Sequence, residues 1–124
     1  MNVVDSSGWL EFFADGPNAD FFTSAIQDTE KLILPTLSIF EVFKKILQQR
    51  EEGEALQAIA LMQQGAVVEL TSSLALEAAR LSIEEKLPLA DSVMLTTSRA
   101  YEATLWTQDS DFEGMSGVKY VKKI

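Results

Sequence analysis

The chain has 124 residues, 47% of them hydrophobic and 23% charged, which is enough for one buried core and too short for two. It contains no cysteine and no histidine, so disulfides, thiolate nucleophiles, serine-histidine triads and histidine-ligated zinc are excluded. The formal net charge of -9 argues against a broad basic face for nucleic acid and favours a basic protein partner.

Any chemistry must therefore come from carboxylates, hydroxyls, lysines and arginines. No apolar run approaches the roughly 18 to 20 residues that a membrane-spanning helix needs. The first residues also lack a basic stretch ahead of an apolar one. We expect a single soluble, cytoplasmic domain over residues 1–124, without membrane association.

The first part of the chain predicts two short strands separated by two helices. An apolar strand over residues 2–4 stops at Asp5, and apolar residues over 9–13 recur at helical spacing. A turn that contains glycine and proline then leads to a second helix over 19–29. Residues 31–34 have the composition of the second strand.

The middle of the chain is predicted to be mostly helical. A helix is expected over 37–50, where Phe40, Phe43 and Leu47 belong to an apolar stripe that should face the core. A further helix and a short strand at 67–68 follow.

The last part of the chain predicts two helices and two strands. Ser72 or Ser73 should cap a helix that runs to about residue 85, and Pro88 should open the next helix. Strands are expected over 103–107 and, at a sheet edge, over 118–121. Short strands that alternate with helices predict an α/β fold, with a mostly parallel sheet covered on both faces. Sites in such sheets form at the carboxyl ends of the strands.

Acidic residues follow the predicted strand ends. Asp5 comes directly after the first strand, Asp109 and Asp111 follow the strand that ends at Thr107, and Asp91 lies near a helix start. Taken singly, each is more simply interpreted as a helix cap or loop residue. Parallel pairing of the two strands would instead crowd several carboxylates into one cleft. A hard divalent cation is the natural compensation for that repulsion.

Glu41 is a second kind of candidate, because it is the only charged residue in the apolar stretch LSIFEVF. At 100° per residue, however, it falls on the side of Lys44 and Gln48, away from the apolar stripe. Periodicity alone therefore slightly favours a solvated glutamate. Lys44 and Lys45 are surface charges on the simpler interpretation and phosphate contacts on the alternative.

Several motifs resemble the PIN domain family, and within it the VapC-type toxins. The strongest block is LPLADSVMLTTSRAYEATLWTQDSDF. It is similar to the family pattern of an aspartate that opens a helix, a strand ending in threonine, and an aspartate followed two residues later by Asp-Phe. In this sequence these residues are Asp91, Thr107, Asp109, Asp111 and Phe112.

Two further motifs resemble the same family in the same order. VVDSS matches a strand-end aspartate with a hydroxyl two residues on, which gives Asp5 and Ser7, and SIFEV matches a glutamate early in a central helix, which gives Glu41. The resemblance covers nearly the whole chain. Glu102 stands where the family often has glycine, and threonines at 96–97 replace commonly smaller residues. Neither departure removes a carboxylate.

The resemblance implies a fold, an activity and partners. The fold would be a three-layer α/β/α sandwich, and the activity would be hydrolysis of RNA with Mg²⁺ or Mn²⁺ by an endoribonuclease. A VapB-type antitoxin would silence the protein, and a homodimer is expected. The acidic site implied by the resemblance consists of Asp5, Glu41, Asp91 and Asp109, with Ser7, Thr107 and Asp111 as supporting groups.

Two other functions fit parts of the sequence. A phosphoacceptor receiver domain needs an aspartate after a central strand, but no aspartate occurs between Asp28 and Asp91, and Asp5 has no acidic neighbour. We therefore disfavour it. A noncatalytic PIN-like binding module, whose acids are only structural caps, stays open. Carboxylates within reach of one metal ion would favour catalysis, whereas scattered carboxylates would favour the binding module.

Overall fold

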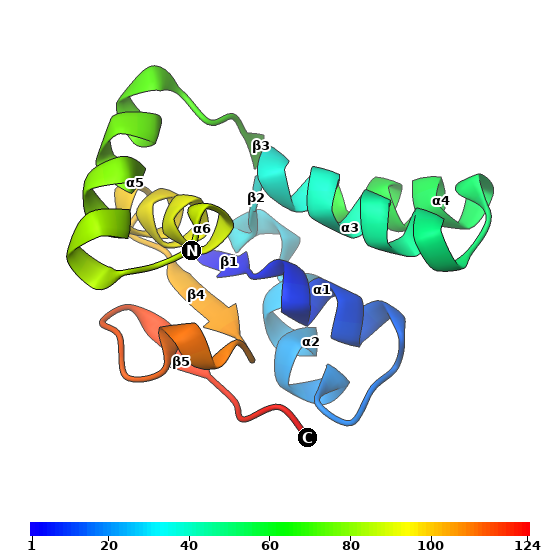
Figure 1. Cartoon of the computed structure of the whole chain (residues 1–124). Helices are drawn as coiled ribbons and strands as arrows, with labels where there is room; N and C mark the ends of the chain where they lie inside the picture. The colour runs from blue at the N-terminus through cyan, green and yellow to red at the C-terminus, as the bar shows by residue number, and fades with distance from the viewer.

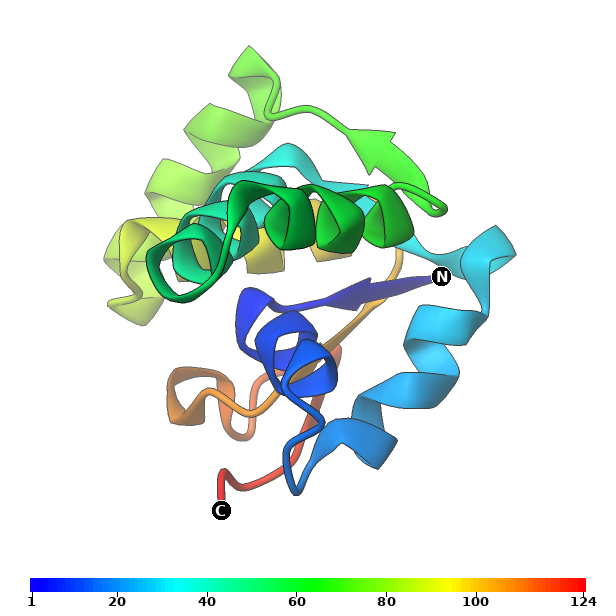
Figure 2. The same cartoon turned by 90° about the vertical axis from the view of Figure 1, so that its right-hand side faces the viewer.

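A parallel sheet runs through the protein, with helices on both of its faces (Figure 1 and Figure 2). The computed structural model describes all residues from 1 to 124. The strands are β1 (Asn2–Val4), β2 (Ile33–Pro35), β3 (Ala66–Val68), β4 (Thr104–Thr107) and β5 (Val118–Tyr120). The helices are α1 (Ser6–Phe13), α2 (Ala19–Gln27), α3 (Thr36–Gln49), α4 (Glu52–Met62), α5 (Ser72–Glu85) and α6 (Leu89–Ala100), with 3₁₀ turns η1 (Thr29–Lys31) and η2 (Ser110–Phe112).

All strand pairs are parallel. β4 lies between β1 and β5, and β2 pairs with β3. A parallel bridge from Asn2 to Leu32 connects these two groups at the start of β1. The predicted edge position of the last strand is confirmed, because β5 pairs only with β4. The mostly parallel sheet predicted from the alternation of strands and helices is confirmed as well.

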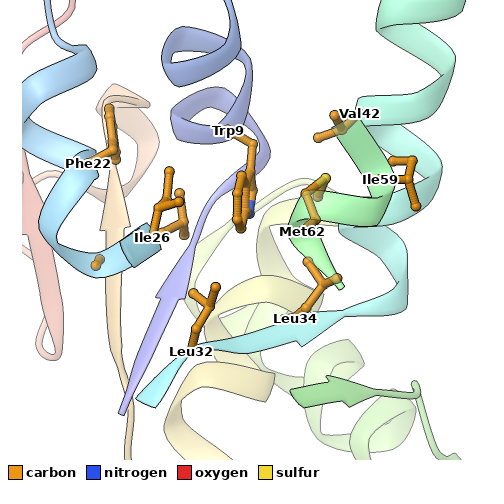
Figure 3. Packing of buried hydrophobic residues seen from close by; sticks show 10 residues of the cluster. Trp9, Phe22, Ile26, Leu32, Leu34, Val42, Ile59 and Met62 are labelled. Atoms are coloured by element: carbon orange, nitrogen blue, oxygen red, sulfur yellow. The ribbon is translucent and has the colours of Figure 1, made fainter. Parts of the chain in front are cut away.

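Successive side chains along each strand point to opposite faces of the sheet, so the protein has two cores, one on each face. Val3 packs with α6 residues such as Met94, whereas Val4 packs with Trp9 of α1 and Phe22 of α2. Figure 3 shows the second of these cores, where side chains from α1, α2, α3 and α4 meet those of the strands. Both faces of the sheet are therefore covered, which gives the three layers of an α/β/α sandwich.

Some helix boundaries differ from the sequence prediction. α2 ends at Gln27, because η1 begins at Thr29 before the chain enters β2. Helix α5 is capped by Thr71, whose Oγ1 accepts a hydrogen bond from the backbone N–H of Leu74 at 3.2 Å. The prediction of Ser72 or Ser73 as the cap was therefore wrong. Thr71 is the first of three successive hydroxyl residues and occupies the capping position, whereas Ser72 already lies inside the helix.

The predicted core face of α3 was right for Phe43, which packs against the core, and wrong for Phe40 and Leu47. Phe40 is 62% exposed and Leu47 is 43% exposed, whereas Ser38 and Val42 are buried. α3 packs against α4, and the two helices extend together away from the sheet (Figure 1). Ile39, Phe43 and Ile46 pack against the core beside Val42, so the side of α3 that carries Phe40 and Leu47 faces away from it. No helix of the protein combines the length and apolarity that crossing a membrane requires.

Candidate metal centre

Asp5 lies where β1 ends, beside the end of β4. Its backbone N–H donates to the carbonyl of Trp106 at 2.9 Å, which extends the strand pairing one residue past Val4. The Asp5 side chain is buried, and its Oδ2 accepts hydrogen bonds from Ser7 Oγ at 2.8 Å and from Thr107 Oγ1 at 3.0 Å. Both hydroxyls bind the same oxygen, so Oδ1 accepts neither of them.

Asp5 does not act as a helix cap, although it immediately precedes α1. A capping aspartate would accept a hydrogen bond from a backbone N–H in the first turn. The side chain of Asp5 makes no such bond and is held by hydroxyls from α1 and β4 instead. The simplest structural explanation for an aspartate at this position therefore does not apply.

Three more carboxylates converge near the end of β4. Asp91 lies in the first turn of α6, Asp109 follows β4, and Asp111 lies in η2. One oxygen from each carboxylate lies within 4.8 Å of those of the other two. Asp109 does cap η2, because its Oδ1 accepts from the backbone N–H of Asp111 at 2.9 Å. Its own N–H donates to Thr107 Oγ1 at 2.9 Å, so one hydroxyl links the Asp109 loop to Asp5.

Glu41 approaches the same region from α3. Its Oε1 accepts a hydrogen bond of 2.7 Å from Ser6 Oγ, and its side chain is half-buried. Ser6 adjoins Asp5 in the chain. The helical-wheel interpretation, which placed Glu41 on a solvated face, does not hold. A wheel compares residues within one helix and carries no information about which other element approaches it. Ser6 was not predicted as a supporting group, because the VVDSS motif indicated only the hydroxyl of Ser7.

Crowding and burial change the acidity of two members of this group. Burial raises the pKa of Asp5, and the charges of Asp109 and Glu41 add to the increase. Burial, followed by the charges of Asp109 and Asp5, raises the pKa of Asp91 to about 7. A side-chain hydrogen bond with Asp111 contributes in the same direction. Without a cation, a proton on Asp91 therefore relieves part of the repulsion.

The donor set fits a hard divalent cation. Carboxylate oxygens are the ligands that Mg²⁺ and Mn²⁺ prefer, and the chain has no histidine or cysteine for softer metals. The sequence assigned Asp111 a supporting role, and the structure brings its carboxylate within ligand distance of Asp91 and Asp109. Asp5 and Glu41 stand close enough for their charges to act on each other.

A model of the PIN domain family matches residues 3–118. The chain belongs to the PIN domain family. The match includes the ends of β1 and β4 and the first turn of α6, where the acidic residues of this PIN domain lie. A search of curated proteins by sequence finds no match.

Solved structures similar to this PIN domain include proteins of toxin-antitoxin systems. A toxin-antitoxin complex from Klebsiella pneumoniae aligns with a TM-score of 0.80 and 19% identity, covering 96% of each chain. VapC20 of Mycobacterium tuberculosis, described as a sarcin-ricin loop cleaving toxin, aligns with a TM-score of 0.76 and 15% identity, covering 94% of this chain and 95% of that one. VapBC2 from Rickettsia felis, bound to promoter DNA, aligns with a TM-score of 0.74 and 8% identity, covering 98% and 97%. These likenesses establish the VapC-like fold.

Proposed function

We propose that this PIN domain is a divalent-metal-dependent endoribonuclease that hydrolyses phosphodiester bonds of RNA. The observation that carries the proposal is the convergence of three carboxylates within 4.8 Å of one another, next to the buried Asp5. Such crowding costs stability unless a proton or a cation compensates for it. A protein that needed these acids only as caps would have no reason to gather them.

Four acids are the proposed ligands of Mg²⁺ or Mn²⁺: Asp91 and Asp109, which belong to the group of three converging carboxylates, and Asp5 and Glu41, whose charges interact beside it. When bound, such an ion lowers the pKa of its water and stabilises negative charge on the phosphate. Ser7 and Thr107 orient Asp5 by donating to one of its oxygens.

Two of the other side chains complete this arrangement. Ser6 orients Glu41 by donating to its Oε1. Asp111 supports Asp91, and the hydrogen bond between them favours the protonated form when no ion is present. The carboxylates of Asp5 and Glu41 are thus held by neighbouring hydroxyls, and that of Asp109 by the backbone N–H of Asp111.

The same proposal includes the role of a toxin that a VapB-type antitoxin silences. It is supported by the fold shared with chains of toxin-antitoxin complexes and by the net charge of -9, which suits a basic partner. We also propose that the protein works in the cytoplasm and forms a homodimer, as the family resemblance implies.

The test is RNA cleavage by purified protein. Activity should require Mg²⁺ or Mn²⁺ and disappear in excess chelator, because the chain has no histidine to act as a metal-free general base. Asp91→Asn, purified in parallel, controls for contaminating nuclease and should reduce the cleavage rate by at least about a hundredfold. Cleavage in excess chelator by the parent that Asp91→Asn lacks would contradict the metal mechanism, whereas equal cleavage by both proteins would indicate a contaminating nuclease. Absence of any cleavage with either metal, across structured and single-stranded RNA, would favour the noncatalytic binding module.

A further inference from the structure

A pair of buried amides lies directly beside the acidic site. Asn18 is 6% exposed and Gln108 is 4% exposed, and Asn18 Nδ2 donates to Gln108 Oε1 at 3.0 Å. Asn18 precedes α2, yet its side chain makes no capping hydrogen bond to that helix. Its side chain is used instead for a contact with a residue ninety positions away in the sequence.

The amide pair joins four segments of the chain. Asn18 Nδ2 also donates to the carbonyl of Lys122 at 3.1 Å, and Gln108 Nε2 donates to the carbonyl of Ser7 at 3.3 Å. Because both carbonyls only accept hydrogen bonds, each amide has a single orientation that satisfies the whole network. The backbone of Asn18 is fixed as well, since its N–H donates to Glu11 Oε2 at 2.7 Å.

The position of Gln108 connects this network to the acids. Gln108 lies between Thr107, which donates to Asp5, and Asp109. Its side chain reaches Ser7, whose hydroxyl donates to the same oxygen of Asp5. The amide pair thus ties the loop that carries Asp109 to the start of α1, which carries the second hydroxyl on Asp5.

We propose that Asn18 and Gln108 are positioning residues that set the distance between Asp5 and Asp109. The inference rests on the proposed metal-dependent function and names residues that act on that site through others. Two buried amides contribute little to stability compared with apolar side chains of the same size, because their burial costs desolvation. A hydrogen-bond network in which nearly every donor has an acceptor does, however, fix the arrangement of the segments that it joins.

The experiment replaces both amides by apolar side chains of similar size, in Asn18→Leu/Gln108→Met. Manganese binding is measured from the electron paramagnetic resonance signal of free Mn²⁺, and stability is measured as the Tm in chelator. We expect the Kd for Mn²⁺ to rise about ten- to a hundredfold, as is usual when groups that orient metal ligands are lost. The Tm in chelator should change little.

Ser98→Ala is the matched control. Ser98 is fully buried, and its Oγ donates to the carbonyl of Ala103 at 2.9 Å, at the end of α6 opposite to Asp91. This variant should lower the Tm and leave the Kd for Mn²⁺ unchanged. The single variant Gln108→Met gives the same comparison if the double variant does not fold.

The outcomes separate this inference from the proposed function. Parental binding of Mn²⁺ by a folded double variant would show that the amide pair has no positioning role, while the metal site would stand. If the parent and Asp109→Asn bind Mn²⁺ equally, the proposed metal site itself is wrong, and the positioning role falls with it. A Kd that rises only in proportion to a lowered Tm, as for a general loss of structure, would also overturn the inference.

Discussion

Burial, together with the charges of Asp109 and Asp5, raises the pKa of the Asp91 carboxyl to about 7, because all three oppose its ionised form. The unfolded chain releases the same proton near its ordinary pKa of 3.8. Between these two values the folded protein therefore binds more protons than the unfolded chain. The free energy of unfolding must then fall as pH rises through this window.

We predict that, in chelator, the protein melts at a higher temperature at pH 5 than at pH 8. Asp91→Asn should remove part of this difference, since the raised pKa of Asp5 also contributes, and it should raise the Tm at pH 8 because it removes a charge from a repelling cluster. A gain of about 1 kcal/mol corresponds to roughly 3 to 5 °C for a domain of this size. Melting curves of both proteins from pH 5 to 8 provide the test.

Manganese should reverse the pH trend in the parent protein. The ion competes with the proton on Asp91, so its stabilisation should be larger at pH 8 than at pH 5. Asp91→Asn should gain less from manganese at either pH. Equal pH profiles for the two proteins would show that Asp91 does not carry the buried proton.

The positions of the individual acidic residues in the site could be predicted from the sequence to different degrees. Asp5 and Asp109 follow strands whose apolar residues are evident, so the pairing of β1 with β4 brings them together as expected. Glu41 could not be placed in this way, because its position depends on Ser6 of another helix. The contact between Asn18 and Gln108 was not predicted, since neither amide carries a sequence signal for a partner so far away in the chain.

At the scale of elements, α1 can lie close to α2 and β1 only because residue 8 is glycine. A Cβ added to Gly8 would stand 2.5 Å from Phe22 Cε1 and 2.8 Å from Val4 Cγ1, which are core side chains. Gly53, in the first turn of α4, has nothing within 4 Å of the same added atom. Both glycines lie in the first turn of a helix, but only Gly8 is crowded, so Gly53 serves as its control.

Gly8→Ala should lower the free energy of unfolding by about 1 to 3 kcal/mol, because the added methyl group overpacks the core. Gly53→Ala should raise it by about 0.5 to 1 kcal/mol, because alanine loses less backbone entropy than glycine in a helix. Urea denaturation of the two variants and the parent measures both effects. A neutral Gly8→Ala would mean that α1 can move away from Phe22 at no cost.

Helix α3 shows why the bounds of a helix were predicted better than the side of the helix that faces the core. Its bounds lie within one residue of the predicted range of 37–50. Its core-facing side was predicted only in part, because apolar residues surround most of the helix and hydrophobicity alone cannot rank them. Ser38 and Val42 are fully buried and Phe43 packs against the core, whereas Phe40 is exposed.

For the whole molecule, the alternation of strands and helices was sufficient to predict a parallel sheet with two covered faces. The order of the strands was not predicted beyond the β1 and β4 pair and the edge position of β5. Strand order depends on long-range contacts, such as the bridge between Asn2 and Leu32, for which three-residue strands carry little sequence information.

The whole chain has 19 acidic and 10 basic residues, and α3 and α4 leave large apolar side chains exposed. These side chains are Phe40, Leu47, Leu56 and Leu61. A partner that combines a basic segment with an apolar helix would satisfy both features. Ionic contacts at the surface weaken as salt is added, because the screening length is only about 3 Å in 1 M salt. Apolar burial does not weaken in this way.

We therefore predict that the protein, purified from its native host at natural abundance, carries a small partner with a basic segment and an apolar helix, and that 1 M sodium chloride alone does not separate them. Denaturant should separate them, and the refolded chain should then cleave RNA faster than the complex, because the basic segment no longer occupies the acidic site. A partner that salt releases completely would indicate a purely ionic contact. Repeated recovery of the chain alone, together with harmless expression in the absence of any partner, would contradict the toxin role.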